Sequence, residues 1–294
     1  MSPSRPTISL MISTYNWEKA LALVLHSAAQ QSQLPDEVIV ADDGSREDTA
    51  SLLHDCARGF PVPLRHVWQS DDGFRLARAR NRGIAAARGD YLIQLDGDMI
   101  MHRHFVADHM RLARPGVFLQ GTRIRTTEAE TARLLSGGAP HFGWSVDAYY
   151  RKEGDRSTYH FGRRHHTLRI PLLAALKARS SGHPMGCNVS FWRKDLLEVN
   201  GYDERMVGYG SEDLELDQRL RQSGLRRSQI KFAALALHLE HPSSAPPDPS
   251  APELPNNQLL YASRDAQKVR CEEGLDHHMP EFSAKPAVDL RASK

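Results

Sequence analysis

The order of secondary-structure signals in the first hundred residues constrains the fold more than any other feature of the chain. Apolar, β-rich runs alternate with helical patterns in the order strand, helix, strand, helix, strand, helix, strand. The strand-like runs are TISLMIST, DEVIVADDGS, LRHVWQ and DYLIQLD. This alternation predicts a parallel α/β sheet with right-handed crossovers, and a ligand site beyond the carboxyl ends of its strands.

The remaining segments carry weaker structural signals. Ser45, with Asp48 three residues later, predicts a capped helix that runs to about Arg58. GVFLQGTRI and IKFAALALHLEH read as strands, and GCNVSFWRKDLLEVNGYDE reads as a strand, a short helix and a turn. SEDLELDQRLRQSG reads as a capped amphipathic helix, and NNQLLYASRDAQKVRCEEGL as a terminal helix.

Several polar side chains fall at the predicted carboxyl ends of the first, second and fourth strands: Tyr15, Asp42, Asp43, Asp96 and Asp98. Asp96 and Asp98 flank a glycine, and such carboxylates can hold a hard divalent cation whose shell substrate phosphates complete. Taken alone, an Asp-Gly turn explains this pattern more often. Asp42 and Asp43 could accept hydrogen bonds from a nucleobase or ribose, or could simply form an acidic loop before a helix. Their convergence at one sheet edge is the first functional signal.

A basic helix follows the third predicted strand. DDGFRLARARNRG places Arg75, Arg78 and Arg82 on one face of this helix, with Arg80 off that face. Guanidinium groups there could pair with a diphosphate, or could form a solvated basic surface.

Two patterns in the second half suggest chemistry. Glu212 and Asp213 open a predicted helix, where acids suit the helix dipole, but a carboxylate there could also act as a general base. His238 and His241 end a predicted strand and point to opposite faces if the chain stays extended. Both could reach one metal only if the chain turns, which Pro242 makes credible. The alternative is a pair of surface histidines before a linker.

Composition excludes several classes of protein. The net charge of +2 does not argue for a nucleic-acid partner. Cys56, Cys187 and Cys271 are widely spaced and odd in number, which supports neither a zinc ribbon nor a disulfide scaffold and favours a reducing cytosol. No stretch reaches the roughly 18–20 apolar residues that span a bilayer. We therefore expect a cytoplasmic protein that could still bind a membrane surface.

The order and spacing of three blocks identify a resemblance to a known family. ISTYNWEKALALVLHSAAQQSQLPDEVIVADDGS and RNRGIAAARGDYLIQLDGD resemble the nucleotide-sugar-binding half of family 2 glycosyltransferases with the GT-A fold. GCNVSFWRKDLLEVNGYDE with GYGSEDLELDQRLRQSG resembles the acceptor half of chondroitin-polymerase-type enzymes and β-1,4-galactosyltransferases. The resemblance covers about residues 7–242. It implies a mostly parallel, Rossmann-like sheet flanked by helices, with a smaller acceptor-side subdomain.

The resemblance implies a division of the chain. Residues 1–121 would form the nucleotide-sugar-binding half, and residues 122–242 the acceptor-side half. Residues 126–182 match no part of the family and form an Arg-, His- and Tyr-rich insert that could bind an acceptor or an anionic membrane, or could be a solvated segment. Residues 243–256 would be a Pro-rich linker or loop, and residues 257–294 a C-terminal helix and tail.

The resemblance also implies roles for the donor-side residues. Ser13, Thr14 and Tyr15 match the loop that holds the uracil. Asp43, with Asp42 beside it, matches the acid that reads the base or ribose. The implied basic contact to the nucleotide is Arg75.

Metal-binding and catalytic roles follow in the same way. Asp96 and Asp98 match the D-x-D motif, in which Asp98 would bind the metal most directly and Asp96 would lie nearer the ribose and the metal's waters. His241 matches a metal-binding histidine, and His238 lies where a second, weaker ligand would be. Glu212 and Asp213 match the acceptor-side acidic pair, with Asp213 as the general base.

The implied activity is an inverting glycosyl transfer that depends on Mn²⁺ or Mg²⁺. A hexose or N-acetylhexosamine would move from a UDP-sugar to a hydroxyl of a saccharide or lipid-linked saccharide, in bacterial surface polysaccharide or lipopolysaccharide synthesis. The enzyme would be cytoplasmic, with peripheral association at the inner face of the membrane left open. The alternatives are a nucleotidyltransferase, which normally has a glycine-rich loop that STYNWEKA lacks, and a non-catalytic nucleotide-sugar-binding module.

Overall fold

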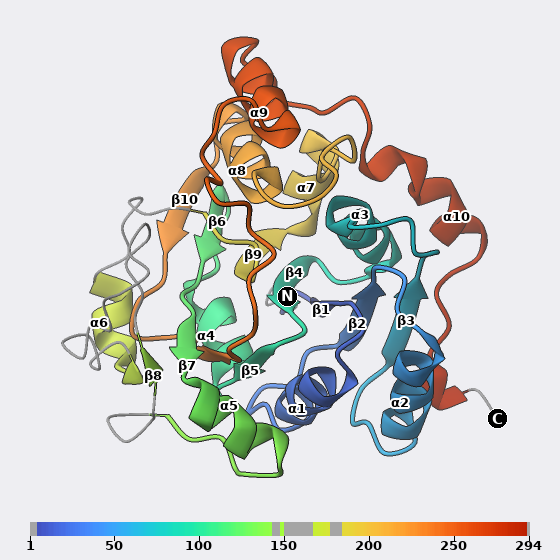
Figure 1. Cartoon of the computed structure of the whole chain (residues 1–294), viewed down its shortest axis with the longest axis vertical. Helices are drawn as coiled ribbons and strands as arrows, with labels where there is room; N and C mark the ends of the chain where they lie inside the picture. The colour runs from blue at the N-terminus through green and yellow to red at the C-terminus, as the bar shows by residue number, and fades with distance from the viewer. Residues whose placement is uncertain (1–4, 143–147, 150–166, 177–183, 293–294) are drawn as a thin grey trace.

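A seven-stranded sheet forms the centre of the computed structural model, which describes residues 5–142, 148–149, 167–176 and 184–292 (Figure 1). Its strand order is β10-β6-β9-β4-β1-β2-β3. The bounds are β1 Ile8–Thr14, β2 Glu37–Asp42, β3 Leu64–Trp68, β4 Tyr91–Asp96, β6 Val117–Gln120, β9 Asn188–Trp192 and β10 Arg226–Gln229. Every pairing in this sheet is parallel except those of β9 with β4 and β6. The predicted mostly parallel α/β sheet is confirmed.

A four-stranded sheet adjoins the first, with the strand order β5-β11-β7-β8. Its strands are β5 Met99–Met101, β7 Ile124–Thr126, β8 Ala148–Tyr149 and β11 Ala236–His238. Two strand predictions change here. GVFLQGTRI divides into β6 and β7, which belong to different sheets, and IKFAALALHLEH is extended only over β11 because Phe232 and Ala234 have positive φ angles.

Helices cover both faces of the central sheet. In Figure 1, α1 and α2 lie below the sheet, and α3, α7 and α8 lie above it. The helices are α1 Glu18–Ala29, α2 Glu47–Ala57, α3 Leu76–Ala86, α4 Phe105–Leu112, α5 Glu128–Leu135, α6 Pro171–Leu176, α7 Arg193–Val199, α8 Glu212–Gln222, α9 Pro255–Asp265 and α10 Met279–Ala284. Within the described residues, no helix combines the length and the apolar character needed to cross a bilayer.

The side-chain alternation of β1 explains this layered arrangement. Leu10 and Ile12 face the core that contains residues of α1 and α2, whereas Met11 faces the core that contains residues of α3, α7 and α8. Both faces of β1 are buried, which is why TISLMIST shows no alternation of apolar and charged residues; Ser9 and Ser13 are buried on the same face as Met11. The apolar run is therefore the signature of a central strand.

Two predicted caps differ from the structure. Arg46 occupies the N-cap of α2, while the hydroxyl of Ser45 accepts a hydrogen bond of 2.9 Å from the Asn16 N–H. Ser211 is the N-cap of α8, but it has a left-handed conformation and its hydroxyl contacts Asn257 instead of the helix. In both places the hydroxyl joins two segments that are distant in sequence.

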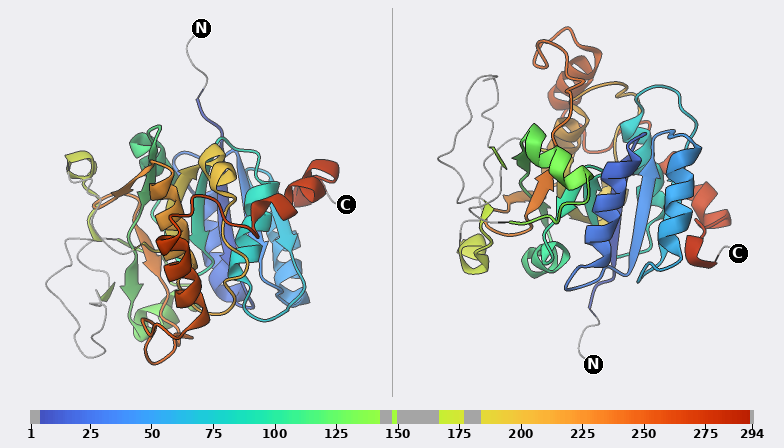
Figure 2. Two further views of the ribbon diagram at one scale, coloured as in Figure 1. Left: turned by 90° about the horizontal axis from the view of Figure 1, so that it is seen from above. Right: turned by 60° about the horizontal axis from the view of Figure 1, so that its bottom comes forward.

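The C-terminal segment is more folded than a helix and a tail. The helix predicted over residues 256–275 is the shorter α9, and Gln267 has a positive φ just beyond its end. Short helices η2 Leu275–His277, α10 and η3 Leu290–Ala292 follow. Figures 1 and 2 show this segment passing α3 and reaching β3, where Asp289 forms a β-bridge with Arg65.

Candidate functional site

A cleft of about 590 Å³ opens beyond the carboxyl ends of β1 and β4, at the edge where the alternation of strands and helices predicts a ligand site. Strand register brings the strand ends together, because Ser13 pairs with Asp96 and Thr14 pairs with Asp42. The sequence-predicted residues that line the cleft are Ser13, Thr14, Tyr15, Asp43, Asp96, Asp98, Glu212, Asp213, His238 and His241.

Asp43 provides a buried carboxylate at the side of the cleft where the donor is predicted to bind. Its Oδ1 accepts a hydrogen bond of 2.7 Å from Gln69 Nε2, and its Oδ2 accepts one of 2.9 Å from the backbone N–H of Arg75. Burial raises the pKa of Asp43 to about 6. Tyr15 is about half-exposed, and its hydroxyl donates to Asp71. This wall could therefore combine a hydrogen-bond acceptor with an aromatic surface.

Two residues predicted for the donor side do not line the cleft. Asp42 is fully buried, where it accepts the Ser45 N–H and pairs with His66 Nε2 at 2.8 Å. The Arg75 guanidinium pairs with Asp72 at 2.9 Å, and only its backbone N–H approaches the site. Asp42 thus organises the loop that presents Asp43.

The turn at residues 96–98 connects the two sheets. Asp96 ends β4, and β5 begins at Met99, one residue after Asp98. The Gly97 N–H donates to the Ser13 carbonyl at 2.7 Å, and a Cβ at Gly97 would lie 2.8 Å from that same oxygen. Glycine is therefore needed here for the close approach of two backbones.

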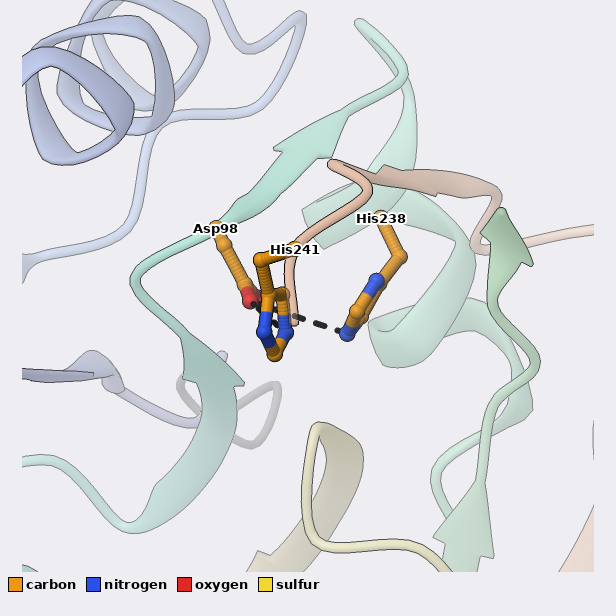
Figure 3. Close-up of side chains that lie close together, drawn as sticks. All are labelled: Asp98, His238 and His241. Carbon is orange, nitrogen blue, oxygen red and sulfur yellow. Dashed lines mark ion pairs between the residues drawn. The ribbon is translucent and has the colours of Figure 1, made fainter. Parts of the chain in front are cut away.

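Asp98, His238 and His241 form one cluster (Figure 3). Asp98 Oδ2 lies 3.2 Å from His241 Nε2 and 3.6 Å from His238 Nε2. The turn required for both histidines to converge is present, and the Leu239 N–H donates to the Asp98 carbonyl. The sequence predicted that both histidines could reach one metal only if the chain turns, and the structure has this turn.

The donor set of this cluster fits a divalent metal ion. Two ligands of one ion, each about 2.1 Å away, lie roughly 3 Å apart at near-right angles, close to the separations seen here. Among the described residues, Asp98 Oδ1 and His238 Nδ1 are buried without a hydrogen-bond partner. His241 Nδ1 lies 2.8 Å from the Pro242 carbonyl, and such a contact orients the ring and leaves Nε2 for a metal.

Electrostatics favour the metal-binding protonation states of His238 and Asp98, whereas the hydrogen bond with Asp98 raises the pKa of His241. Burial lowers the pKa of His238 to about 4, which keeps the ring neutral. Burial opposes ionisation of Asp98, but His238 and His241 outweigh it and lower the pKa of this carboxyl. A neutral imidazole and an ionised carboxylate are the forms that ligate metals.

A buried arginine connects Asp96 with the acidic pair of α8. Nη1 of Arg80 lies 2.9 Å from Asp213 Oδ1 and 3.2 Å from Glu212 Oε1, and Nη2 lies 3.2 Å from Asp96 Oδ1. The guanidinium also lies 5.2 Å from the centre of the Tyr202 ring. Asp96 is thus an ion-pair partner of Arg80 and lies outside the Asp98–His238–His241 cluster.

The two carboxylates predicted for the acceptor side begin α8. Asp213 Oδ2 accepts a hydrogen bond of 2.6 Å from the Gly186 N–H, so a backbone amide and Arg80 together orient this carboxylate. Burial, reinforced by the charge of Asp213, raises the pKa of Glu212 to about 7. Gly208, Gly210 and Ser211 all have positive φ angles, which shape the loop that leads into the helix.

Sequence reasoning missed several lining residues, namely Trp17, Phe74, Arg80, Arg123, Arg125, Gly186, Cys187, Tyr209 and Ser243. Arg80 was set aside because it lies off the face shared by Arg75 and Arg82. A usable signal was the i, i+2 spacing of Arg123 and Arg125 after a strand, which places both on one face. Residues 143–147, 150–166 and 177–182 of the insert lie outside the described residues.

Comparisons with known proteins identify the family of this chain. A family model described as glycosyl transferase family 2 matches residues 9–196, and one described as the N-terminal domain of galactosyltransferase matches residues 174–242. Validoxylamine A glucosyltransferase of Streptomyces hygroscopicus subsp. limoneus is 31% identical over 309 residues, which cover 91% of this chain and 63% of that protein. Chondroitin synthase of Escherichia coli is 29% identical, with 80% of this chain and 35% of that one covered.

Solved structures share the fold at low sequence identity. GalNAc-T7 with UDP, GalNAc and Mn²⁺ has a TM-score of 0.59 at 15% identity, and the match covers 99% of this chain and 56% of that one. A mannosyltransferase from Pyrobaculum calidifontis in complex with GDP-Man and Mn²⁺ has a TM-score of 0.52 at 16% identity, covering 99% and 79%.

Proposed function

The chain belongs to glycosyl transferase family 2 and is a hexosyltransferase with a GT-A-like fold, and on that premise we propose an inverting, metal-dependent transfer. The donor is a UDP-sugar that carries a hexose or N-acetylhexosamine, and the acceptor is a saccharide or lipid-linked saccharide hydroxyl. The relatives named chondroitin synthase and hyaluronan synthase support a role in bacterial surface polysaccharide synthesis.

One observation carries the proposal: a single cleft contains both the Asp98–His238–His241 cluster and the oriented carboxylate of Asp213. Asp98, His238 and His241 would hold Mn²⁺ or Mg²⁺, which when bound neutralises charge on the donor diphosphate as a Lewis acid. Asp43 would accept a hydrogen bond from the uracil imide, and Tyr15 would lie against the base. A general base and a leaving-group site in one cleft are the requirements for a single displacement.

Asp213 would act at the acceptor oxygen. The carboxylate takes the hydroxyl proton as that oxygen forms its bond to the anomeric carbon, and the bond from that carbon to the diphosphate breaks. Attack from the face opposite the leaving group inverts the anomeric configuration, as in base-assisted sugar hydrolysis. The Gly186 N–H and Arg80 hold the carboxylate in a fixed direction, which favours proton transfer along one line.

A donor screen tests the function. Purified protein with Mn²⁺ is combined with a panel of UDP- and GDP-sugars, and thermal stabilisation and sugar release are measured. A bound donor raises the unfolding temperature according to its concentration relative to Kd. Asp213→Asn should keep this stabilisation and lose transfer by at least about a hundredfold.

Two outcomes would remove the proposal. If no nucleotide sugar stabilises the protein, the cleft is not a donor site. If Asp213→Asn transfers sugar at the wild-type rate, Asp213 is not the base. Stabilisation without turnover across a broad set of acceptors would instead indicate a binding module.

A further inference from the structure

Arg123, directly before β7, and Arg125, within it, line the cleft beside the metal-ligand cluster. β7 pairs in parallel with β11, and Arg125 lies directly opposite His238 in that register. Paired residues on neighbouring strands project from the same face of the sheet, and Arg123, two residues earlier, shares that face. Both arginines line the cleft together with His238 and Asp98.

Neither guanidinium forms an ion pair with the described part of the chain. Other arginines near this region are paired, as Arg80 is with Asp213 and Arg227 with Asp217, whereas Arg123 and Arg125 form no ion pair or hydrogen bond with any described residue. Both are partly buried. Within the described residues, each partly buried guanidinium therefore lacks a counterion, and an anionic ligand in the cleft could supply one.

The neighbouring acids do not satisfy these arginines. Asp96 is engaged by Arg80, and Asp98 is engaged by the two histidines. Burial disfavours the charge of Arg123, yet Cys187, Asp96 and Asp98 nearby raise the pKa of its guanidinium, so it stays charged. The cleft therefore offers two cations with free hydrogen-bond donors next to the candidate metal site.

We propose that Arg123 and Arg125 form an oxyanion subsite that binds the diphosphate of the nucleotide-sugar donor and stabilises it as the leaving group. This proposal rests on the proposed function. When the bond to the anomeric carbon breaks, its electron pair goes to the diphosphate oxygen, which gains one negative charge, while the acceptor proton goes to Asp213. Positive groups fixed where charge develops favour the transition state over the bound substrate.

The position of the pair favours a diphosphate over a carboxylate on the sugar. Arg125 is the cross-strand neighbour of His238, so its guanidinium and a metal held by His238 would both contact the diphosphate. The planar guanidinium fork matches two oxygens of a phosphate. The carboxylate of Asp98 would offset one of the two charges of a divalent ion. The two arginines would add positive charge beside the ion and stabilise the departing diphosphate.

Titration calorimetry at saturating Mn²⁺ tests this assignment with uridine and UDP as probes. Arg123→Met and Arg125→Met should each weaken UDP binding by about tenfold, and leave uridine binding unchanged. The Lys variants, which keep the charge but lose the fork, should recover part of the affinity. Arg82→Met is the matched control, because Arg82 pairs with Glu281 and does not line the cleft. In transfer assays, kcat should fall in the Met variants.

The failures are distinguishable. Wild-type affinity for UDP in both Met variants would overturn the subsite while leaving the proposed function intact. A defect confined to donors with a hexuronate, with UDP binding unchanged, would also overturn it and assign the arginines to a sugar carboxylate. If the wild-type protein neither binds UDP nor transfers any sugar, the proposed function itself fails.

Discussion

The guanidinium of Arg80 donates a hydrogen bond of 2.9 Å to the carboxylate of Asp213, although the two residues lie 133 positions apart. The same side chain reaches Asp96 at the end of β4, so it joins the D-x-D turn to the helix that carries the proposed base. Arg80 is almost completely buried, which leaves it few other conformations. The groups proposed for the donor side and for the acceptor side therefore share one rigid cation.

Replacing Arg80 should damage both stability and activity. Arg80→Met leaves three carboxylates without their shared cation, and removing one partner of a buried ion pair costs about 3–5 kcal/mol. Transfer should fall by at least about a hundredfold, because Asp213 loses a group that orients it. Chemical denaturation and initial rates measure the two effects.

Arg80→Lys and Arg82→Met complete that experiment. Lysine keeps the charge but has no planar fork to bridge Asp213 and Asp96, so its activity should stay well below that of the wild type. Arg82 lies two residues away on α3 and pairs with Glu281, so Arg82→Met should leave transfer nearly unchanged. Equal activity of Arg80→Met and the wild type would contradict the positioning role.

Gly186→Ala should impair the proposed base without changing any ionisable group. A Cβ at Gly186 would overlap Oδ1 of Asp213, so either this carboxylate or the backbone that leads into β9 must move. We expect a loss of roughly a hundredfold in transfer and about 1–3 kcal/mol in stability, with UDP affinity retained. Gly59→Ala is the control, since nothing lies within 4 Å of its Cβ position. A fully active Gly186→Ala enzyme would show that Asp213 need not occupy this position.

His238→Ala and His241→Ala should each weaken Mn²⁺ binding by at least about tenfold, measured by calorimetry in the absence of nucleotide. Both Nε2 atoms approach the same oxygen of Asp98, so each truncation removes one ligand. His54→Ala, on the exposed surface of α2, is the control. Unchanged Mn²⁺ affinity in both variants would exclude this cluster as the metal site.

Uridine affinity should depend on pH through Asp43. The pKa of this carboxyl is raised to about 6, and only its ionised form is a full acceptor for the imide. Affinity should therefore be constant above pH 7 and fall about tenfold on acidification to pH 5. Asp43→Asn should bind uridine weakly with no such step. A wild-type profile that is flat from pH 8 to 5 would argue against base recognition by Asp43.

The same shift has a consequence for folding. Because the folded pKa exceeds that of the unfolded chain, native Asp43 binds more protons between about pH 4 and pH 6. Its contribution therefore destabilises the fold above pH 6, and this cost disappears as the pH falls through that window. A carboxylate kept ionised at a cost in stability is typical of a functional site.

Local patterns were sufficient for the first half of the fold. The strands β1, β2 and β4 are mostly apolar and buried on both faces, and the helices between them have clear amphipathic spacing, so short-range signals agree with the tertiary structure. The sequence did not predict β10, because Arg226–Gln229 is polar and forms a strand by pairing with β6. The split of GVFLQGTRI depends on two separate sheets, which a local pattern does not encode.

The site shows the same division between local and tertiary information. Asp96, Asp98 and Asp43 follow strands, and their convergence follows from parallel topology. Arg80 was predicted to lie off the functional face, because helical spacing alone does not say which face meets α8. His238 and His241 required a turn whose existence depends on packing beside Asp98. The sequence was therefore sufficient to predict the aspartates of the site, whereas the roles of Arg80 and the two histidines depend on tertiary contacts.

The two-residue passage from β4 to β5 has a final consequence. Asp96, Gly97 and Asp98 are each held by backbone hydrogen bonds, to Cys187, Ser13 and Leu239. An inserted or deleted residue here would invert the pleat of β5 and turn Asp98 away from both histidines. Chain length at this turn is thus as restrictive as residue identity, and variants with altered spacing should lose the metal site even with both aspartates kept.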